Sequence, residues 1–129
     1  MNTKTAAQRL GRWGEELAAG YLRQRGYLLL ESNARTPNGE IDLVACQEDA
    51  GISCTVFVEV KTRRSGAFGL PEESVTARKR AHLLASARAY LQAHPELDGV
   101  WRIDVIAIRQ THLDATPEIL HFENAISAE

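Results

Sequence analysis

The sequence has little of several features that would assign a function directly. It contains only two cysteines, Cys46 and Cys54, and they lack CxxC spacing, so a zinc site is not expected. No apolar run approaches the ~20 residues that cross a bilayer. Residues 1–9 are polar and lack the apolar core of a signal peptide. We therefore expect a cytoplasmic protein with no membrane partner.

Other absences narrow the function further. The four histidines show no metal-ligand spacing, and Gly66 and Gly69 alone do not make a phosphate-binding loop. The two cysteines flank a short predicted loop, so a cross-strand disulfide is conceivable, but reduced thiols are expected in a cytosolic protein. The net charge of −2 and the pI near 6.1 argue against a purely electrostatic nucleic-acid binder. The charge is nevertheless uneven, because residues 27–60 carry a net −5 and residues 61–80 a net +4.

The length and the hydrophobic pattern predict the architecture. A protein of 129 residues is expected to form a single domain, residues 1–129, with a hydrophobic core that needs no disulfide or metal ion to stabilise it. Periodicity predicts a helix over residues 5–25, ended by Gly26, and a second helix from residue 72 or 76 to residue 93, before Pro95. Predicted strands span residues 27–31, 40–46, 55–62, 101–108 and 118–123, and residues 32–38 are predicted as a loop. This order predicts an α/β fold with a mixed β-sheet flanked by helices on both faces.

The predicted strand over residues 55–62 carries the most informative side chains. Side chains alternate across a strand, so Phe57, Glu59 and Lys61 point to one face. The opposite face consists of valines and is expected to be buried. A carboxylate and an ammonium group are costly to bury beside a core unless they are matched or used. This stretch is therefore the first candidate for a functional site.

A second acid lies just upstream, in the segment GEIDLV. Asp42 and Glu59 fall on consecutive predicted strands, so their carboxylates are expected to converge across a hairpin. Two carboxylates and the backbone carbonyl of Val60 form a hard-oxygen site that suits Mg²⁺ or Mn²⁺. Lys61 would orient the attacking water or stabilise negative charge in the transition state. Glu15, on the inward edge of the first helix, could ligate a metal through water or hold a second ion.

These motifs carry a resemblance to a known superfamily. GEIDLV, then VFVEVKTR, together with GRWGEE in the first helix, resembles the PD-(D/E)XK (restriction-endonuclease-like) nucleases. Within that superfamily the protein is most similar to the bacterial YraN-like family, and more distantly it is similar to archaeal Holliday junction resolvases. By position, Asp42 matches the first motif acid, Glu59 and Lys61 match the ExK pair, and Glu15 matches the helix glutamate. Lys79 occupies the place of a supporting Lys or Gln.

The resemblance covers nearly the whole sequence and implies a restriction-endonuclease-like αβββαβ core with a metal-dependent nuclease site. One departure is that Ile41 stands where the superfamily's name has a proline, a replacement that is common there. For this family the resemblance supports the fold more firmly than the activity.

Several other charged residues lie in or near these motifs. Lys79 and Arg63 are the best candidates for nucleic-acid contacts, although each could equally be an ordinary solvated charge. Glu40 shares a predicted face with Asp42, but it lies nearer the loop and is expected to support the site or be solvated. Arg102 and Asp104 are expected to form a structural ion pair.

The leading hypothesis is a divalent-metal-dependent endonuclease acting on DNA, including branched or otherwise structured DNA. A second hypothesis is a noncatalytic nucleic-acid-binding module that retains the nuclease fold. A third, weaker hypothesis is a structural protein whose acids bind a stabilising ion. Symmetric cutting of a junction would require a two-fold homodimer, for which the sequence offers no clear surface.

Overall fold

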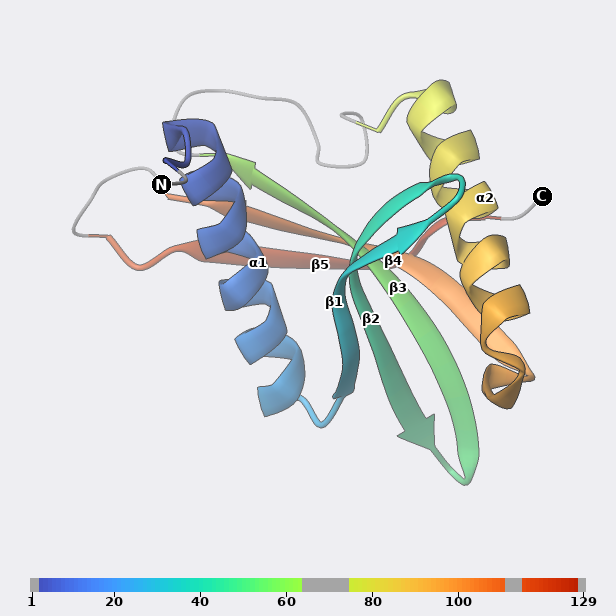
Figure 1. The fold of residues 1–129 in the computed structure, drawn as a ribbon. Helices are drawn as coiled ribbons and strands as arrows, with labels where there is room; N and C mark the ends of the chain where they lie inside the picture. The colour runs from blue at the N-terminus through green and yellow to red at the C-terminus, as the bar shows by residue number, and fades with distance from the viewer. Residues whose placement is uncertain (1–2, 64–74, 111–114, 128–129) are drawn as a thin grey trace.

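The structure consists of one β-sheet between two helices (Figure 1). The computed structural model describes residues 3–63, 75–110 and 115–127. The elements are α1 (Ala6–Gln24), β1 (Leu28–Thr36), β2 (Gly39–Asp49), β3 (Ile52–Arg63), α2 (Ala77–Ala93), a 3₁₀ turn (Pro95–Leu97), β4 (Val100–Arg109) and β5 (Glu118–Ile126).

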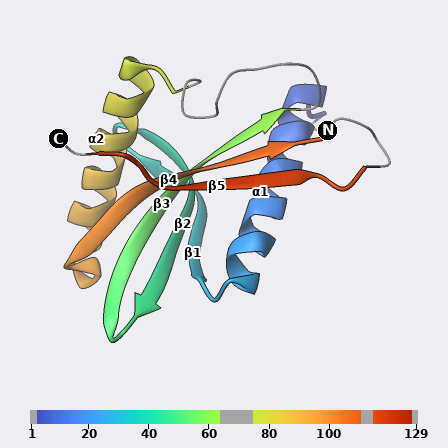
Figure 2. The ribbon, with the colours of Figure 1, turned by 180° about the vertical axis from the view of Figure 1, so that it is seen from behind.

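The five strands follow one another across the sheet in sequence order, β1 to β5. Neighbouring strands are antiparallel except for β3 and β4, which are parallel and are connected through α2. Helix α1 covers one face and α2 the other, and β5 forms the edge opposite β1 (Figure 2). The predicted α/β fold, a mixed sheet with helices on both faces, is confirmed, and β5 adds one strand to the αβββαβ order.

Local signals in the sequence fix the ends of both helices. Thr5 caps α1, and its side chain and that of Gln8 form a reciprocal capping box. Gly26 follows α1 with a φ of 88°, a left-handed conformation that glycine adopts without steric cost. Thr76 caps α2 by accepting a hydrogen bond from the Lys79 N–H, so the later of the two predicted starts is correct.

The core lies in two layers, one on each face of the sheet. Val56 and Val58 pack with Leu22 and other residues of α1, and Phe57 packs with Tyr90 of α2 on the opposite face. The predicted alternation along β3 is therefore confirmed. Among the described residues, neither helix combines the length and the apolar character that a membrane span requires. Both cysteines are free thiols, as expected.

The predicted loop over residues 32–38 is wrong, because β1 continues to Thr36 and the turn is much shorter. Most of its polar residues are exposed to solvent, but several of them pair with residues of β2. The hairpin that β1 and β2 form here reaches toward α2 (Figure 1). Gly39 in this turn lies close to α2, where an added Cβ would be 3.0 Å from Ser86 Oγ. Strand alternation predicts that Ile41 and Leu43 share one face, but Ile41 packs on the α2 side and Leu43 on the α1 side. A loop is also predicted over residues 63–71, but residue 63 ends β3, and residues 64–71 lie outside the described residues.

Gly14 is the point of closest approach between α1 and β3. A Cβ built at Gly14 would lie 2.1 Å from Thr62 Oγ1, 3.0 Å from its Cγ2 and 3.1 Å from its Cβ. Rotating the threonine side group does not relieve all three contacts, so the helix or the strand would have to move. Gly14 therefore serves close packing, whereas a Cβ built at Gly11 would have no atom within 4 Å.

We expect Gly14→Ala to lower the free energy of unfolding by about 1–2 kcal/mol. Overpacking costs about 1–3 kcal/mol, and the higher helix propensity of alanine returns up to about 1 kcal/mol. Urea denaturation would measure the change. Gly20→Ala is the matched control, because nothing lies within 4 Å of a Cβ there, and it should stabilise the protein. Thr62→Ala should restore much of the lost stability, and a Gly14→Ala variant more stable than the wild type would contradict the contact.

Candidate functional site

The candidate site lies where the sheet divides into two branches. Strands β2 and β3 pair from Asp49–Ile52 up to Leu43–Val58. Beyond that point β2 continues only with β1, and β3 continues with β4 as far as Arg63 (Figure 1). This fork lets side chains from the two helices, which cover opposite faces of the sheet, approach the same place. We call this position the strand fork.

Asp42 and Glu59 are the first residues beyond the last β2–β3 pair. Continuing the register would place their side chains directly opposite each other, which is unfavourable for two like charges. At the fork, Asp42 Oδ2 instead accepts a hydrogen bond of 2.8 Å from the Val60 N–H. The carboxylate thus accepts a backbone hydrogen bond of β3 that the C=O group of a neighbouring strand would otherwise accept. This bond fixes the position of Asp42 relative to Glu59.

The surroundings of Asp42 favour its protonated form. Burial and then the negative charge of Glu59 raise its pKa from 3.8 to about 7, with a smaller contribution from Glu15. The Val60 N–H and the positive charge of Lys79 act in the opposite direction. Near neutral pH, Asp42 is therefore divided between its two protonation states, and a bound cation would favour the ionised one.

Glu59 is buried and has two lysine partners. The residue is 5% exposed, and its Oε1 lies 3.1 Å from Lys79 Nζ and 3.7 Å from Lys61 Nζ. The side chain of Lys61 is only 18% exposed, whereas that of Lys79 is 44% exposed. This arrangement differs from a solvated ion pair at a sheet edge, because the carboxylate and Lys61 are both largely removed from water.

The oxygens at the fork match the chemistry of a hard divalent ion. Asp42, Glu59 and the backbone carbonyl of Val60 are oxygen donors of the kind Mg²⁺ and Mn²⁺ prefer. Within the described ranges, no group of three or more His, Cys, Asp and Glu side chains is gathered closely enough to hold a metal ion. Glu15 is near enough to affect the Asp42 pKa, but it does not complete such a group. The donor set thus fits an ion that keeps several positions for water or substrate oxygens.

The other predicted residues fall around the fork in different ways. Arg63 ends β3 and donates a hydrogen bond of 3.1 Å to the C=O of Thr62. Glu40 is exposed, as expected, and lies 3.9 Å from Arg35. Lys79, predicted as a nucleic-acid contact, lies 3.1 Å from Glu59 Oε1 while its side chain remains 44% exposed.

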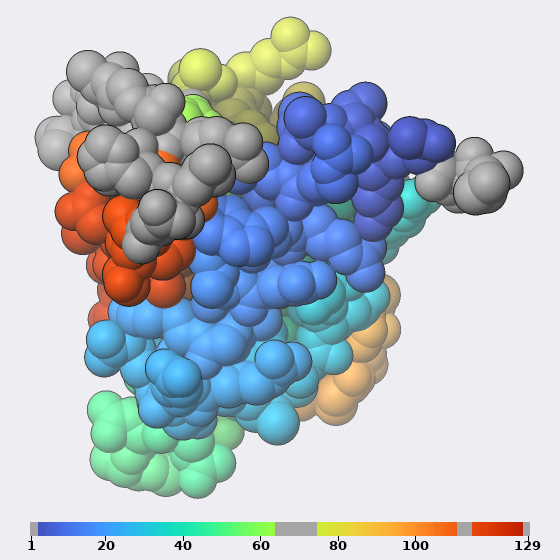
Figure 3. All heavy atoms as spheres, turned by 90° about the vertical axis from the view of Figure 1, so that its left-hand side faces the viewer, coloured from blue at the N-terminus to red at the C-terminus, as the bar shows by residue number. Residues whose placement is uncertain are grey.

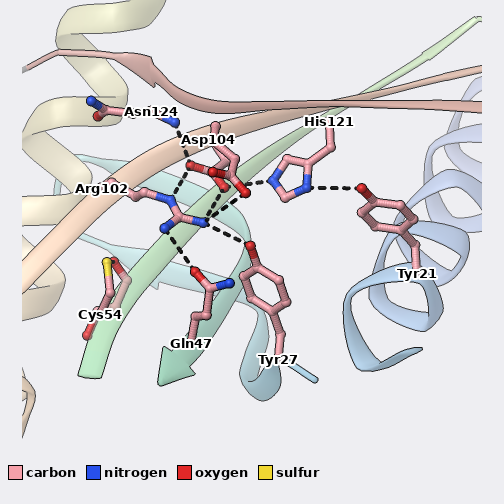
Figure 4. Close-up of polar contacts among 10 residues, drawn as sticks. Tyr21, Tyr27, Gln47, Cys54, Arg102, Asp104, His121 and Asn124 are labelled. Atoms are coloured by element: carbon pink, nitrogen blue, oxygen red, sulfur yellow. Dashed lines mark hydrogen bonds and ion pairs between the residues drawn. The ribbon is translucent and has the colours of Figure 1, made fainter. Parts of the chain in front are cut away.

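A second polar network lies on the α1 face of the sheet, centred on Asp104 (Figure 4). Asp104 is fully buried, and Arg102 donates to both of its oxygens, at 2.9 and 3.2 Å. Arg102 also donates to Tyr27 and Gln47, at 2.8 and 3.0 Å. The predicted structural ion pair is therefore confirmed, within a larger set of contacts.

The same network ties the edge strand β5 to the sheet. His121 Nε2 lies 2.7 Å from Asp104 Oδ2, and its Nδ1 lies 3.2 Å from the Tyr21 hydroxyl (Figure 4). The Asn124 N–H donates to Asp104 Oδ1 at 2.9 Å. Burial alone would raise the pKa of Asp104, but the hydrogen bonds from His121, Arg102 and Asn124 hold it below its ordinary value. This network satisfies a buried charge, which indicates a structural role.

Sequence reasoning missed two residues that the structure makes prominent. His121 received no role because its spacing to the other histidines fits no metal site, yet it contacts Asp104. Asn33 fell in a predicted loop, but it lies in β1 and donates a hydrogen bond of 2.9 Å to Glu15 Oε1. Its only signal in the sequence is its residue type, since asparagine tolerates the left-handed backbone found here, with φ of 52°.

The architecture is an α/β fold consistent with a restriction-endonuclease-like core, with two acids and a lysine gathered at the strand fork. Residues 14–108 match the family described as "Uncharacterised protein family UPF0102". A UPF0102 protein of Syntrophomonas wolfei is 50% identical over 116 residues, which are 90% of this sequence and 96% of that protein. A UPF0102 protein of Syntrophotalea carbinolica is 46% identical over 121 residues, 93% of each protein.

The protein therefore belongs to the UPF0102 family. This confirms the predicted YraN-like family. Membership in the nuclease superfamily remains a prediction.

Proposed function

We propose that this protein is a divalent-metal-dependent endonuclease that hydrolyses phosphodiester bonds in DNA, with branched or otherwise structured DNA as the first substrate class to test. One observation carries the proposal: Asp42, Glu59 and Lys61 meet at the strand fork, with Glu59 only 5% exposed. Burying Glu59 beside a second, half-buried acid is costly, and the pKa of Asp42, raised to about 7, reflects that cost. Perturbed carboxyl groups of this kind are concentrated at functional sites.

The proposed metal would be held by Asp42, Glu59 and the backbone carbonyl of Val60, with Glu15 reaching it through water. Mg²⁺ commonly binds through one or two carboxylates and completes its shell with waters and phosphate oxygens. A site with few protein ligands therefore suits a phosphodiester substrate. When bound, the ion would polarise the phosphate group and lower the pKa of a water molecule.

Lys61 has the second proposed role. Its ammonium group is largely buried, lies 3.7 Å from Glu59 Oε1, and shares the face of β3 that carries Glu59. In that position it would orient a water molecule or stabilise negative charge on the phosphate oxygens in the transition state. Lys79, at 3.1 Å from the same carboxylate oxygen, would hold Glu59 in place.

The proposal is tested by cleavage of plasmid, single-stranded and four-way-junction DNA with Mg²⁺ or Mn²⁺. We expect Lys61→Met to cut about 100–1,000-fold more slowly than the wild type, because it removes one charge-stabilising donor. Arg88→Met is the control, since Arg88 is exposed on α2 nine positions beyond Lys79. The proposal fails if the wild type cuts none of these substrates, or if Lys61→Met cuts equally well.

A noncatalytic nucleic-acid-binding module is the second candidate function. One observation favours it: both lysines lie within 4 Å of Glu59 Oε1, so charges of the protein itself balance this carboxylate. It predicts binding to DNA or RNA that weakens as the salt concentration rises, with no cleavage in the presence of any metal ion.

The nuclease proposal makes a further demand on the oligomeric state. If junctions are cut in symmetric pairs, two copies related by a two-fold axis are required, and light scattering with and without the junction would detect that homodimer.

A further inference from the structure

Asn33 is a polar residue of β1 that faces the strand fork from the edge of the sheet. It lies between the paired residues Ser32–Leu43 and Ala34–Ile41, so the register places it across from Asp42. Its φ of 52° is left-handed, which turns its side chain out of the ordinary alternation of the strand. Asparagine is one of the few residues that adopt this conformation readily.

The amide of Asn33 links two carboxylates from different elements. Its Nδ2 donates to Glu15 Oε1 of α1 at 2.9 Å and lies 3.4 Å from Glu40 Oε1 of β2. An amide NH₂ has two hydrogens and no charge, so it can satisfy both acids without neutralising either. This amide therefore joins the Glu15 side chain to the β1–β2 hairpin.

Glu15 needs such a partner to occupy one position. A glutamate on a helix surface has several rotamers, and holding one of them costs conformational entropy. Two pockets, of about 200 and 520 Å³, both have Glu15 and Asn33 in their walls. They lie between α1 and the first hairpin, on the side of the molecule seen in Figure 3. The pair is therefore accessible to solvent and small ions, and its order comes from the hydrogen bond and not from tight burial.

We propose that Asn33 is a positioning residue that holds the carboxylate of Glu15 at the edge of the strand fork, facing Asp42. The role in metal binding rests on the function proposed above. Among the described residues, Asn33 makes no hydrogen bond with Asp42, Glu59 or Val60, which are the proposed metal ligands. Its effect passes through Glu15, whose charge is already felt at Asp42.

The first test is Mn²⁺ binding to the full-length protein, measured by calorimetry for Asn33→Gly, Glu15→Ala and the double variant. Glycine keeps the left-handed backbone without strain and removes only the amide. We expect Asn33→Gly to weaken binding about 10–100-fold, as loss of a residue that orients a metal ligand commonly does. The double variant should bind no more weakly than Glu15→Ala, because both changes remove the same interaction. Additive losses would overturn the inference.

Asn124→Gly provides the matched control. Asn124 is also an asparagine with a left-handed backbone, at φ of 50°, but it contacts Asp104 through its backbone N–H and not through its amide. If both asparagines serve only the backbone, the two glycine variants should bind Mn²⁺ with the same affinity as the wild type. That result would also overturn the positioning role.

The second test needs no metal and separates this inference from the proposed nuclease. In ¹⁵N-labelled protein, the side-chain amide of Asn33 should exchange with solvent more slowly than that of Asn124, and this protection should disappear in Glu15→Ala. If the wild type binds no Mn²⁺, the proposed metal site fails, and the amide exchange alone decides the placement of Glu15. An Asn33 amide that exchanges as fast as that of Asn124 would overturn the inference even if the protein cuts DNA.

Discussion

Asp42→Asn should make the protein more stable above neutral pH and at the same time remove the metal-dependent nuclease activity proposed above. The reason is that burial and Glu59 raise the pKa of Asp42 from 3.8 to about 7, so the ionised form destabilises the folded state. Asparagine is nearly the same size, carries no charge, and keeps an oxygen that can accept the 2.8 Å hydrogen bond from the Val60 N–H.

The pH dependence of this stabilisation has a definite sign. Below about pH 3.8, Asp42 is protonated in both the folded and unfolded states, so the variant should gain nothing. Between about pH 4 and 7 the folded protein retains a proton that the unfolded protein releases, and the free energy of unfolding of the wild type falls as pH rises. At about 1.4 kcal/mol per pH unit, the rise from 3.8 to about 7 gives an upper limit on the order of 4 kcal/mol above pH 8.

Urea denaturation at pH 5 and pH 8 would measure the stability difference between Asp42→Asn and the wild type. Asp49→Asn is the control, because Asp49 is exposed at the β2–β3 turn and should change stability little at either pH. Cleavage by Asp42→Asn should fall at least about 100-fold, since even residues that only orient metal ligands contribute about 10–100-fold. Mg²⁺ should stabilise the wild type at pH 8 but not the variant. An active Asp42→Asn enzyme, or one less stable than the wild type at pH 8, would contradict the assignment.

Arg102→Met should have the largest effect on stability away from the candidate site, lowering the free energy of unfolding by about 3–5 kcal/mol. The change leaves the carboxylate of Asp104 fully buried without its two hydrogen bonds from the guanidinium group. It also removes the donors to Tyr27 and Gln47, so contacts between β4, β2 and the segment that follows α1 are lost together.

The ion pair of Arg109 with Glu118 offers a matched comparison on the same strand. Both of its side chains are substantially exposed, at 39% and 54%, so Arg109→Met should cost no more than about 1 kcal/mol. Thermal and urea unfolding of the two variants would measure the difference. Replacing Asp104 by leucine in the Arg102→Met background should recover part of the loss, because the uncompensated charge is then gone. Equal effects of the two arginine variants would contradict a special role for the buried pair.

The acid stability of the wild type should report on the same network. The folded-state pKa of Asp104 lies below 3.8, so its contribution is fully present above that pH and is lost as the pH falls through the folded-state value. This direction is opposite to that of Asp42, whose ionised form destabilises the fold.

Much of the fold could be predicted because its signals are local. The alternation along β3 placed Glu59 and Lys61 on one face, and the pairing of these two residues in the structure agrees with that. Thr76 and Gly26 marked helix ends through capping and left-handed geometry, which depend only on neighbouring residues. The order of helices and strands then gave the mixed sheet.

The loop predicted over residues 32–38 was wrong because polar, exposed residues can still pair in a β-hairpin. The polar residues 32–38 were predicted as a loop, yet most of them are paired in a hairpin that reaches toward α2. Ile41 packs on an unexpected face because that hairpin bends away from the rest of the sheet. Strand pairing in an exposed hairpin comes from register and turn geometry, neither of which requires apolar residues.

The sequence by itself determined which side chains share a face of β3, where the helices end, and that Asp42 and Glu59 lie on consecutive strands. Only the tertiary structure decided that β2 and β3 separate at Leu43–Val58, that Asp42 accepts a hydrogen bond from the Val60 N–H there, and that Asn33 donates one to Glu15. The physical reason is range: alternation and capping involve residues a few positions apart, whereas the strand fork arises from two helices packing on opposite faces of one sheet.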